Sequence, residues 1–215
     1  MAHSRKLIKL KIAIIDYGYA NIRSVINAFE CFDHDIIVID SPQNLKNVDK
    51  IVMPGVGSFD AGMKGLEERD FIEPLYRRVM EAGVPFIGIC VGLQLMFSGS
   101  EEGRLPGLQW FSGEFSKIPS TTNNLTVPHI GWNDVHINSN SRLFSGIIDT
   151  ADFYFAHSYC LLLDEKTSEY CAGETNYSVK YVSAIEKGNI FGVQFHPEKS
   201  QLAGMKLIEN FINIQ

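Results

Sequence analysis

The stretch that decides the fold is Val84-Pro85-Phe86-Ile87-Gly88-Ile89-Cys90-Val91-Gly92-Leu93-Gln94. Its first part is a short apolar run of the kind found in buried strands, and its last part continues into the helix-like Leu95-Met96-Phe97. A strand that turns at once into a helix lifts the residue at the turn above the end of the sheet. The residues two positions away must then be nearly free of side chain, and Gly88 and Gly92 meet that demand. We call residues 88–92 the elbow.

Cys90 occupies the turn of the elbow, with the spacing of a G-x-S-x-G nucleophile motif and a thiol in place of the hydroxyl. The positive end of the following helix dipole favours a thiolate over a thiol. Cys90 is therefore a candidate nucleophile. The alternative is a small core residue, because free cysteine is among the most buried residue types. A nucleophilic thiolate needs a base, and that base needs an orienting group.

Upstream of the elbow, short apolar runs alternate with helical patterns. Strands are expected over residues 12–15, 36–39 and 51–53, each as continuously apolar as a strand buried in a parallel sheet. Helices are expected to begin at Asn21 and at Ser41-Pro42, and a longer helix over residues 71–82 is closed by Gly83. This alternation predicts a doubly wound α/β fold, whose ligands bind beyond the carboxyl ends of the strands.

The pattern changes after Gly103, where short strand-like pieces are separated by polar loops such as residues 120–124. Antiparallel additions to the sheet are therefore expected in the C-terminal half. The expected pieces, including two arms of a hairpin that flank Glu186-Lys187-Gly188-Asn189, are residues 110–111, 135–137, 153–155, 182–185 and 190–195. A last amphipathic helix is expected over residues 202–212. Residues 160–177 carry no usable motif.

Composition argues against several classes of function. A formal net charge of −6 over 215 residues, without a basic block, argues against a nucleic-acid partner. The absence of a membrane-length apolar run or a signal-peptide pattern leads us to expect a cytoplasmic protein without membrane contact. The four cysteines lie far apart without a C-x-x-C pair, so we expect neither a metal site nor disulfides. This length fits one domain, with residues 1–10 as a poorly ordered extension.

The second expected hairpin arm ends in His196-Pro197-Glu198. Because proline favours an extended chain, His196 and Glu198 are expected to project to the same side of the strand end. A carboxylate near an imidazole can fix its tautomer and stabilise the imidazolium that forms when a thiol proton is taken. A lone histidine at a strand end is usually structural, but this pairing makes His196 a candidate base for Cys90. His129 and His157, in contrast, are expected to be hydrogen-bonded structural residues.

Two motifs together, G-I-C-V-G-L-Q at residues 88–94 and V-Q-F-H-P-E-K-S at residues 193–200, resemble those of the flavodoxin-like, triad-type glutamine amidotransferases. Further motifs resemble the glutaminase subunits of imidazole glycerol phosphate synthase. They are D-Y-G at 16–18, P-G-V-G-S-F at 54–59, P-H-I-G-W-N at 128–133 and H-S-Y at 157–159. The resemblance implies a flavodoxin-like, mainly parallel sheet and a single glutamine amidotransferase domain over residues 1–215.

The resemblance also implies roles for individual residues. Cys90 would attack the side-chain amide of L-glutamine, His196 would move the proton, and Glu198 would orient His196. Backbone N–H groups of Val56, Gly57 and Val91 would form the oxyanion hole. The implied substrate contacts are Gly55, Gln94, Ser158 and Tyr159. The implied partner contacts are Trp132, Tyr154 and Lys199.

The implied partner is a separate (β/α)₈-barrel cyclase subunit that receives the ammonia. In histidine biosynthesis this cyclase makes imidazole glycerol phosphate and an aminoimidazole carboxamide ribotide, and the glutaminase needs no cofactor. The resemblance further implies that the oxyanion loop stays unproductive until the cyclase binds its own substrate.

Two other interpretations stay open at this point. The chain could be a glutaminase that serves a different acceptor, such as pyridoxal phosphate synthesis or the amidation of a cell-surface sugar by a duplicated pair. It could also be a non-catalytic or redox-sensing protein built on the same elbow. The latter would not need His196 and Glu198, and both are present.

Overall fold

A computed structural model describes residues 9–120 and 125–215. Residues 1–8 of the expected N-terminal extension and residues 121–124 of the expected polar loop lie outside the described residues. The rest of that extension, Lys9 and Leu10, contacts the segment before the second strand. Lys9 Nζ lies 2.6 Å from an oxygen of Asp33, and the Leu10 N–H donates to His34 Nδ1 at 3.2 Å.

Parallel strands form the first half of the sheet, in the order β2-β1-β3-β4-β12. Their bounds are β1 Lys11–Ile15, β2 Asp35–Ile39, β3 Lys50–Gly55, β4 Phe86–Cys90 and β12 Ile190–Val193. This is the 2-1-3-4-5 order of flavodoxin-like folds, so the predicted doubly wound sheet is confirmed. Since all these strands run the same way, their carboxyl ends meet at one edge.

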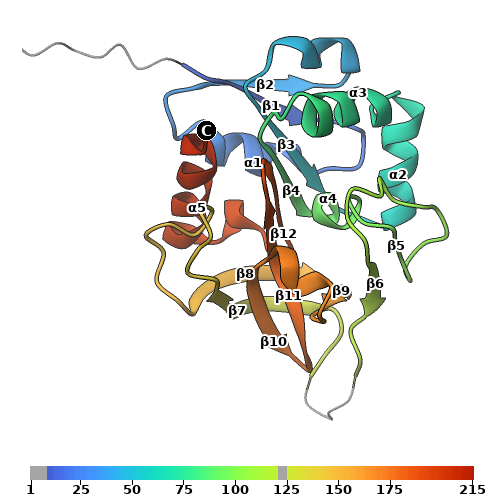
Figure 1. Ribbon diagram of the computed structural model, residues 1–215, viewed down its shortest axis with the longest axis vertical. Coiled ribbons are helices and arrows are strands. Elements are labelled where there is room, and N and C mark those ends of the chain that lie inside the picture. The colour runs from blue at the N-terminus through green and yellow to red at the C-terminus, as the bar shows by residue number, and fades with distance from the viewer. Residues whose placement is uncertain (1–8, 121–124) are drawn as a thin grey trace, which may run out of the picture.

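Helices cover both faces of this parallel sheet (Figure 1). α1 (Ile22–Phe29) and α5 (Gln201–Asn213) lie together on one side, where the rings of Phe29 and Phe211 meet edge to face at 6.5 Å between centroids. α2 (Phe59–Glu68), α3 (Ile72–Tyr76) and α4 (Val91–Gln94) lie on the other side. A π-helical turn over Arg77–Glu81 extends α3, and a 3₁₀ helix over Pro42–Asn47 follows β2.

The second half of the sheet is antiparallel and continues from β12 in the order β11-β10-β7-β8, as expected for the C-terminal half (Figure 1). The remaining strands are β5 Gly99–Ser100, β6 Glu114–Lys117, β7 His129–Ile137, β8 Ala151–His157, β9 Tyr159–Leu162, β10 Cys171–Tyr177 and β11 Val179–Lys187. Lys187 pairs with Ile190, so Gly188 and Asn189 form the turn of the predicted hairpin. Gly188 has a φ of +60°, which a tight hairpin turn requires.

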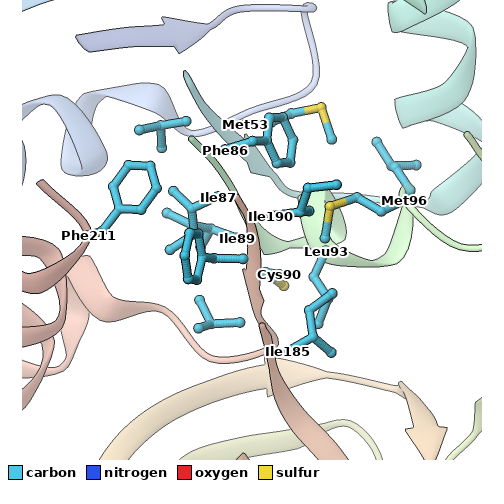
Figure 2. Close-up of a cluster of buried hydrophobic side chains, with 14 of the residues drawn as sticks. Met53, Phe86, Ile87, Ile89, Cys90, Leu93, Met96, Ile185, Ile190 and Phe211 are labelled. Carbon is cyan, nitrogen blue, oxygen red and sulfur yellow. The ribbon is translucent and has the colours of Figure 1, made fainter. Parts of the chain in front are cut away.

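A cluster of buried apolar side chains surrounds β4 and supports the elbow (Figure 2). Phe86, Ile87 and Ile89 are at most 1% exposed, and Leu93 and Met96 extend the cluster beyond the elbow. The labelled neighbours from other elements are Met53, Ile185, Ile190 and Phe211. Burial of one such side chain contributes roughly 1.5–3 kcal/mol, so the elbow rests on a packed core and not on a loop.

One sequence-based expectation about the parallel half is wrong, and one helix was not predicted. Residues 36–39 are not a buried strand, because β2 is the edge of the sheet and Val38 is 45% exposed. α2 is not among the expected helices, because Gly62 and Gly65 weaken its helical pattern. Gly65 serves packing, since a Cβ there would overlap the carbonyl oxygen of Tyr17. Ser58 caps α2 by accepting a hydrogen bond from the Ala61 N–H at 3.4 Å.

Two expectations after the elbow are also wrong. The helical segment ends at Gln94 and does not reach Phe97, and residues 110–111 do not form a strand. Trp110 and Phe111 instead donate their N–H groups to the Met96 carbonyl oxygen, at 2.8 and 3.2 Å. The turn after the elbow is thus tied down by this loop. In the described residues, no helix is long and apolar enough to cross a membrane.

Candidate active site

The elbow has the strained backbone that its sequence predicts. Cys90 has φ +55° and ψ −111°, a conformation that costs an L-residue on the order of 1–3 kcal/mol and is found mainly at functional sites. A Cβ on Gly92 would overlap the carbonyl oxygen of Met53, and a Cβ on Gly88 would lie 2.6 Å from the carbonyl oxygen of Gly92. Only glycine fits at these two positions, and the thiol is presented at the end of β4.

Strand register brings the other predicted segments to the same edge. Gly55 at the end of β3 lies opposite Cys90, so the Gly55-Val56-Gly57 loop starts beside the nucleophile. Val193 at the end of β12 lies opposite Ile89. The chain therefore delivers His196 just beyond the carboxyl ends of the parallel strands.

His196 contacts both other members of the predicted triad. Its Nδ1 lies 2.8 Å from Glu198 Oε1, and the two side chains are only 5% and 4% exposed. The Cys90 sulfur lies close enough to the His196 ring to raise its pKa. The reason given for this pairing from sequence is wrong, because Pro197–Lys199 is a 3₁₀ turn and not an extended segment. The turn folds the Glu198 side chain back toward the imidazole.

Burial and hydrogen bonding act in opposite directions on His196. Burial lowers the pKa of the imidazole, but its hydrogen bonds to Cys90 and Glu198 outweigh this and raise it to about 10. The ring is therefore protonated at neutral pH in the resting protein. A protonated imidazole beside the sulfur is the arrangement that supports a thiolate nucleophile.

We expect Cys90→Ala to lower the pKa of His196. The substitution removes the hydrogen bond and the charge of the sulfur, which raise the pKa, and leaves the burial that lowers it. Titration of the His196 ring by NMR in both proteins measures the shift. An unchanged pKa would show that the imidazole is not coupled to the thiol, and His34, which lies in the N-terminal half, serves as the reference signal.

A cavity of about 250 Å³ opens over the sulfur of Cys90. Its lining includes these predicted site residues: Val56, Gly57, Cys90, Val91, Gln94, Ser158, Tyr159, His196 and Lys199. Gly55 does not line it. A Cβ there would lie 2.6 Å from both the Gly92 nitrogen and the Tyr17 hydroxyl oxygen, so Gly55 allows close packing behind the elbow.

The predicted oxyanion donors differ in whether their backbone N–H groups are free to bind an anion. Val91 is the first residue of α4, where a backbone N–H has no partner within the helix and can point at an anion. The Val56 N–H, in contrast, donates to the Tyr19 carbonyl oxygen at 3.2 Å. It cannot donate to an oxyanion in the same conformation. Gly57 follows with φ +90°, and open space lies where its Cβ would be, so a peptide rotation here meets little resistance.

Two glutamines form a buried pair beside the nucleophile. Gln94 Nε2 donates to Gln194 Oε1 at 3.2 Å, and Gln194 Nε2 lies 3.7 Å from Cys90 Sγ. Within the described residues, Gln94 Oε1 is buried without a hydrogen-bond partner. An orphaned acceptor that lines a cavity is suited to a donor on a ligand. Gln194 was missed in the sequence, although it belongs to the motif that contains His196.

Glu102 is a second residue that sequence analysis missed. It follows β5, lines the cavity, and accepts the Phe59 N–H through Oε2 at 2.8 Å. The hydrogen bond fixes the carboxylate at the wall of the cavity that Ser158 and Tyr159 also line. The adjacent Glu101-Glu102 pair gave no signal in the sequence, because two acidic residues after an apolar run usually mark a solvated turn.

The three residues predicted to contact a partner lie together, with Tyr154 contacting the other two. The rings of Trp132 and Tyr154 meet edge to face at 6.0 Å, and Lys199 Nζ lies 5.5 Å from the Tyr154 ring centroid. Trp132 is 47% exposed. The Tyr154 carbonyl oxygen accepts the His196 N–H at 2.8 Å, and Lys199 lines the cavity. We call Trp132, Tyr154 and Lys199 the aromatic–lysine face.

One protein-family model matches nearly the whole chain. The model of the class-I glutamine amidotransferase family covers residues 13–214. The chain belongs to this family. The matched residues include Cys90, His196 and Glu198. Among the described residues, no cluster of three or more histidine, cysteine, aspartate or glutamate side chains could hold a metal ion.

Individual relatives indicate which members of the family this chain is similar to. The chain is 41% identical to imidazole glycerol phosphate synthase subunit HisH 2 of Methanococcus maripaludis, over 94% of this chain and 98% of that protein. It is 42% identical to subunit HisH of Moorella thermoacetica, over 93% of both. Among solved structures, PurLQS from Thermotoga maritima has a TM-score of 0.68 at 20% identity, and the match covers 96% of this amidotransferase and 99% of the matched chain. That similarity concerns the fold alone.

Proposed function

We propose that this chain is the glutaminase subunit of an imidazole glycerol phosphate synthase. The observation that carries the proposal is the match, at 41–42% identity, to HisH subunits over nearly their whole length. The Cys90–His196–Glu198 contacts beside the cavity support it. Residues 13–214 then act as one glutamine amidotransferase domain.

The proposed chemistry is a two-step amide hydrolysis. The Cys90 thiolate attacks the side-chain amide carbon of glutamine, the C–N bond breaks, and protonated His196 gives its proton to the leaving nitrogen, which departs as ammonia. Water then attacks the thioester while His196 takes a proton, so that glutamate leaves and the thiolate is restored. Glu198 keeps the imidazole oriented and stabilises its charge through the 2.8 Å contact.

Substrate binding follows from the groups that line the cavity. The Glu102 carboxylate is suited to the α-ammonium group of glutamine, which is a charge-assisted contact. Gln94 Oε1 is an acceptor for an N–H of the substrate, and the Ser158-Tyr159 segment holds its other end. We expect no cofactor. A thiol nucleophile must stay reduced, and the cysteines of this chain are free, which supports a cytoplasmic location.

A diazo-ketone analogue of glutamine is expected to label Cys90 alone. Burial raises the pKa of Cys160 to about 12 and that of Cys171 to about 11, so neither is a thiolate at neutral pH. Cys31 is exposed but lies outside the cavity, so a substrate analogue is not held near it. Peptide mapping by mass spectrometry locates the label. Label on Cys160 or Cys171 would point to a different nucleophile, and excess glutamine should protect Cys90.

The proposed partner is the cyclase subunit, and the aromatic–lysine face is the proposed contact. The cyclase is expected to raise the glutaminase activity, and we expect Trp132→Ala and Lys199→Ala to reduce that rise. For Trp132→Ala, which removes a central aromatic side chain, the reduction is expected to be roughly tenfold. Tyr76→Ala is the matched control, because Tyr76 is 43% exposed and belongs to α3, which lies far from β7 and β8 (Figure 1). Equal effects of the three substitutions on the activity of the complex would contradict the assignment.

The acceptor of the ammonia needs its own test, since some relatives carry numbered names, HisH 1 and HisH 2. A numbered copy is consistent with the alternative, a duplicated subunit that serves the amidation of a cell-surface sugar. The decisive experiment measures glutamate release with the cyclase of the same genome and with the cyclase ligand. Stimulation supports the histidine pathway. Complex formation without any stimulation would contradict it.

A further inference from the structure

A chain of buried polar side chains runs from the inner face of β7 to the substrate cavity. Its members are His129 of β7, His157 of β8 and Tyr181 of β11, which are 2%, 5% and 0% exposed. His129 Nδ1 lies 3.1 Å and His157 Nε2 lies 3.3 Å from the Tyr181 hydroxyl oxygen. His157 Nδ1 lies 2.8 Å from the carbonyl oxygen of Tyr159, and Asn133 Nδ2 makes a long 3.5 Å contact with His129 Nε2.

The chemistry of these groups determines which atom donates and which accepts in each hydrogen bond. The Tyr159 carbonyl oxygen can only accept, so His157 Nδ1 carries a proton. Burial lowers the pKa of His157 to about 3, which keeps the ring neutral and leaves Nε2 as an acceptor for the Tyr181 O–H. The Tyr181 oxygen must then accept the Nδ1–H of His129. Burial lowers the pKa of His129 to about 4, so its Nε2 accepts from Asn133.

The hydrogen bonds of neighbouring groups are consistent with these donor and acceptor assignments. The second N–H of the Asn133 amide donates to the Asn176 carbonyl oxygen at 3.3 Å, and Asn133 Oδ1 accepts the Asp134 N–H at 2.9 Å. Thr175 also contacts the Tyr181 hydroxyl, but its own hydroxyl donates to the Asp134 carbonyl oxygen. The imidazole nitrogen of His157 is a stronger acceptor than that hydroxyl, so it takes the Tyr181 proton.

One end of this hydrogen-bond chain lies behind the aromatic–lysine face, and the other lies at the cavity. Asn133 follows Trp132 along β7, so the two side chains project to opposite faces of the strand, and Asn133 shares the inner face with His129. At the other end, the Tyr159 carbonyl belongs to the segment whose Ser158 and Tyr159 line the cavity. The segment sits between β8 and β9, where a single residue separates two strands, so one hydrogen bond to its backbone restricts how it can turn.

We propose that His129, Tyr181 and His157 are positioning residues that hold the Ser158-Tyr159 segment in its glutamine-binding conformation. The inference rests on the proposed glutaminase function and deepens it. It makes Tyr181 a determinant of glutamine affinity, although Tyr181 does not line the cavity. Packing alone does not require this arrangement, because apolar side chains of the same shape fill such a site at little or no loss of stability.

The test is Tyr181→Phe in the complex with the cyclase. This change keeps the ring and removes the hydroxyl that contacts both histidines, so the KM for glutamine is expected to rise on the order of tenfold, with kcat within about twofold. Tyr170→Phe is the matched control, because Tyr170 is 5% exposed and its hydroxyl donates to the Ser112 carbonyl oxygen at 2.8 Å, away from the cavity. A wild-type KM in Tyr181→Phe, or an equal rise in both variants, would overturn the proposal.

A conservative replacement separates positioning from packing. His157→Asn keeps a donor near the Nδ1 position, whereas His157→Leu keeps only bulk. We expect the asparagine variant to recover most of the glutamine affinity that the leucine variant loses. Equal KM values in the two variants would contradict a role for the bond to Tyr159.

The donor and acceptor assignments of the two histidines can be tested without an activity assay. In ¹⁵N NMR spectra at neutral pH, His129 and His157 are both expected as neutral Nδ1–H tautomers, and Tyr181→Phe should perturb both rings. An Nε2–H tautomer at His157 would overturn the proposal. If the wild-type complex released no glutamate while both rings showed the expected tautomers, the glutaminase proposal would fail and the hydrogen-bond chain would stand.

Discussion

Replacing Cys90 by alanine is expected to lower glutamine hydrolysis by roughly 10⁴-fold or more, because the covalent route needs the sulfur. The backbone strain at this position, φ +55°, shows that the elbow is built to present that side chain. His196→Ala should lose a similar factor, since members of a triad act as a unit. Steady-state glutamate release by the complex with the cyclase measures both.

The control for this prediction is the second reaction of the complex. Added ammonium salt should support product formation by the Cys90→Ala complex at the wild-type rate, because the cyclase has its own active site. Near-wild-type glutamate release by Cys90→Ala would contradict the mechanism. Loss of the ammonium-dependent reaction as well would instead indicate that the substitution disrupts the complex.

The isolated chain is expected to hydrolyse glutamine at least about a hundredfold more slowly than the complex with cyclase and cyclase ligand. The contact between His196 and Glu198 is already made, but the Val56 N–H donates to the Tyr19 carbonyl oxygen and not into the cavity. One missing oxyanion donor costs roughly 10²–10³ in rate. Rotation of the Gly55–Val56 peptide would restore it, and the glycines on either side of Val56 lower the cost of that change.

Single-turnover and steady-state glutamate release by the purified chain, alone and with each addition, measure the gain. The cyclase without its ligand should give only part of it. Turnover by the isolated chain at the level of the complex would refute the gating and leave the triad assignment intact. Such a result would mean that the Val56 peptide turns freely in solution.

The sequence alone predicted the elements whose local chemistry is strict. The elbow needs glycine at 88 and 92, and the hairpin that leads to His196 needs the Gly188-Asn189 turn, so both leave clear patterns. α2 was not predicted because Gly62 and Gly65, which allow close packing, weaken the helical pattern of its sequence. The edge position of β2 could not be predicted either, because an apolar run does not indicate which strands will pair with it.

The same distinction applies to the site. Cys90, His196 and Glu198 stand in compact motifs, whereas Gln194 and Glu102 act through contacts that strand pairing and a long loop create. The His129–Tyr181–His157 chain joins three strands far apart in sequence. The hydrogen bond of Val56 to Tyr19 depends on a peptide orientation that composition does not specify. Long-range geometry of this kind needs the folded structure.

The central claim, that Cys90 releases ammonia for use by a cyclase partner, is tested most directly with glutamine labelled with ¹⁵N at its side-chain amide. The complex turns over the cyclase substrate in the presence of excess unlabelled ammonium, and mass spectrometry reads the imidazole glycerol phosphate. We predict that most of the product carries ¹⁵N with the wild-type chain and that none does with Cys90→Ala. Product that carries only unlabelled nitrogen with the wild-type chain would contradict the account.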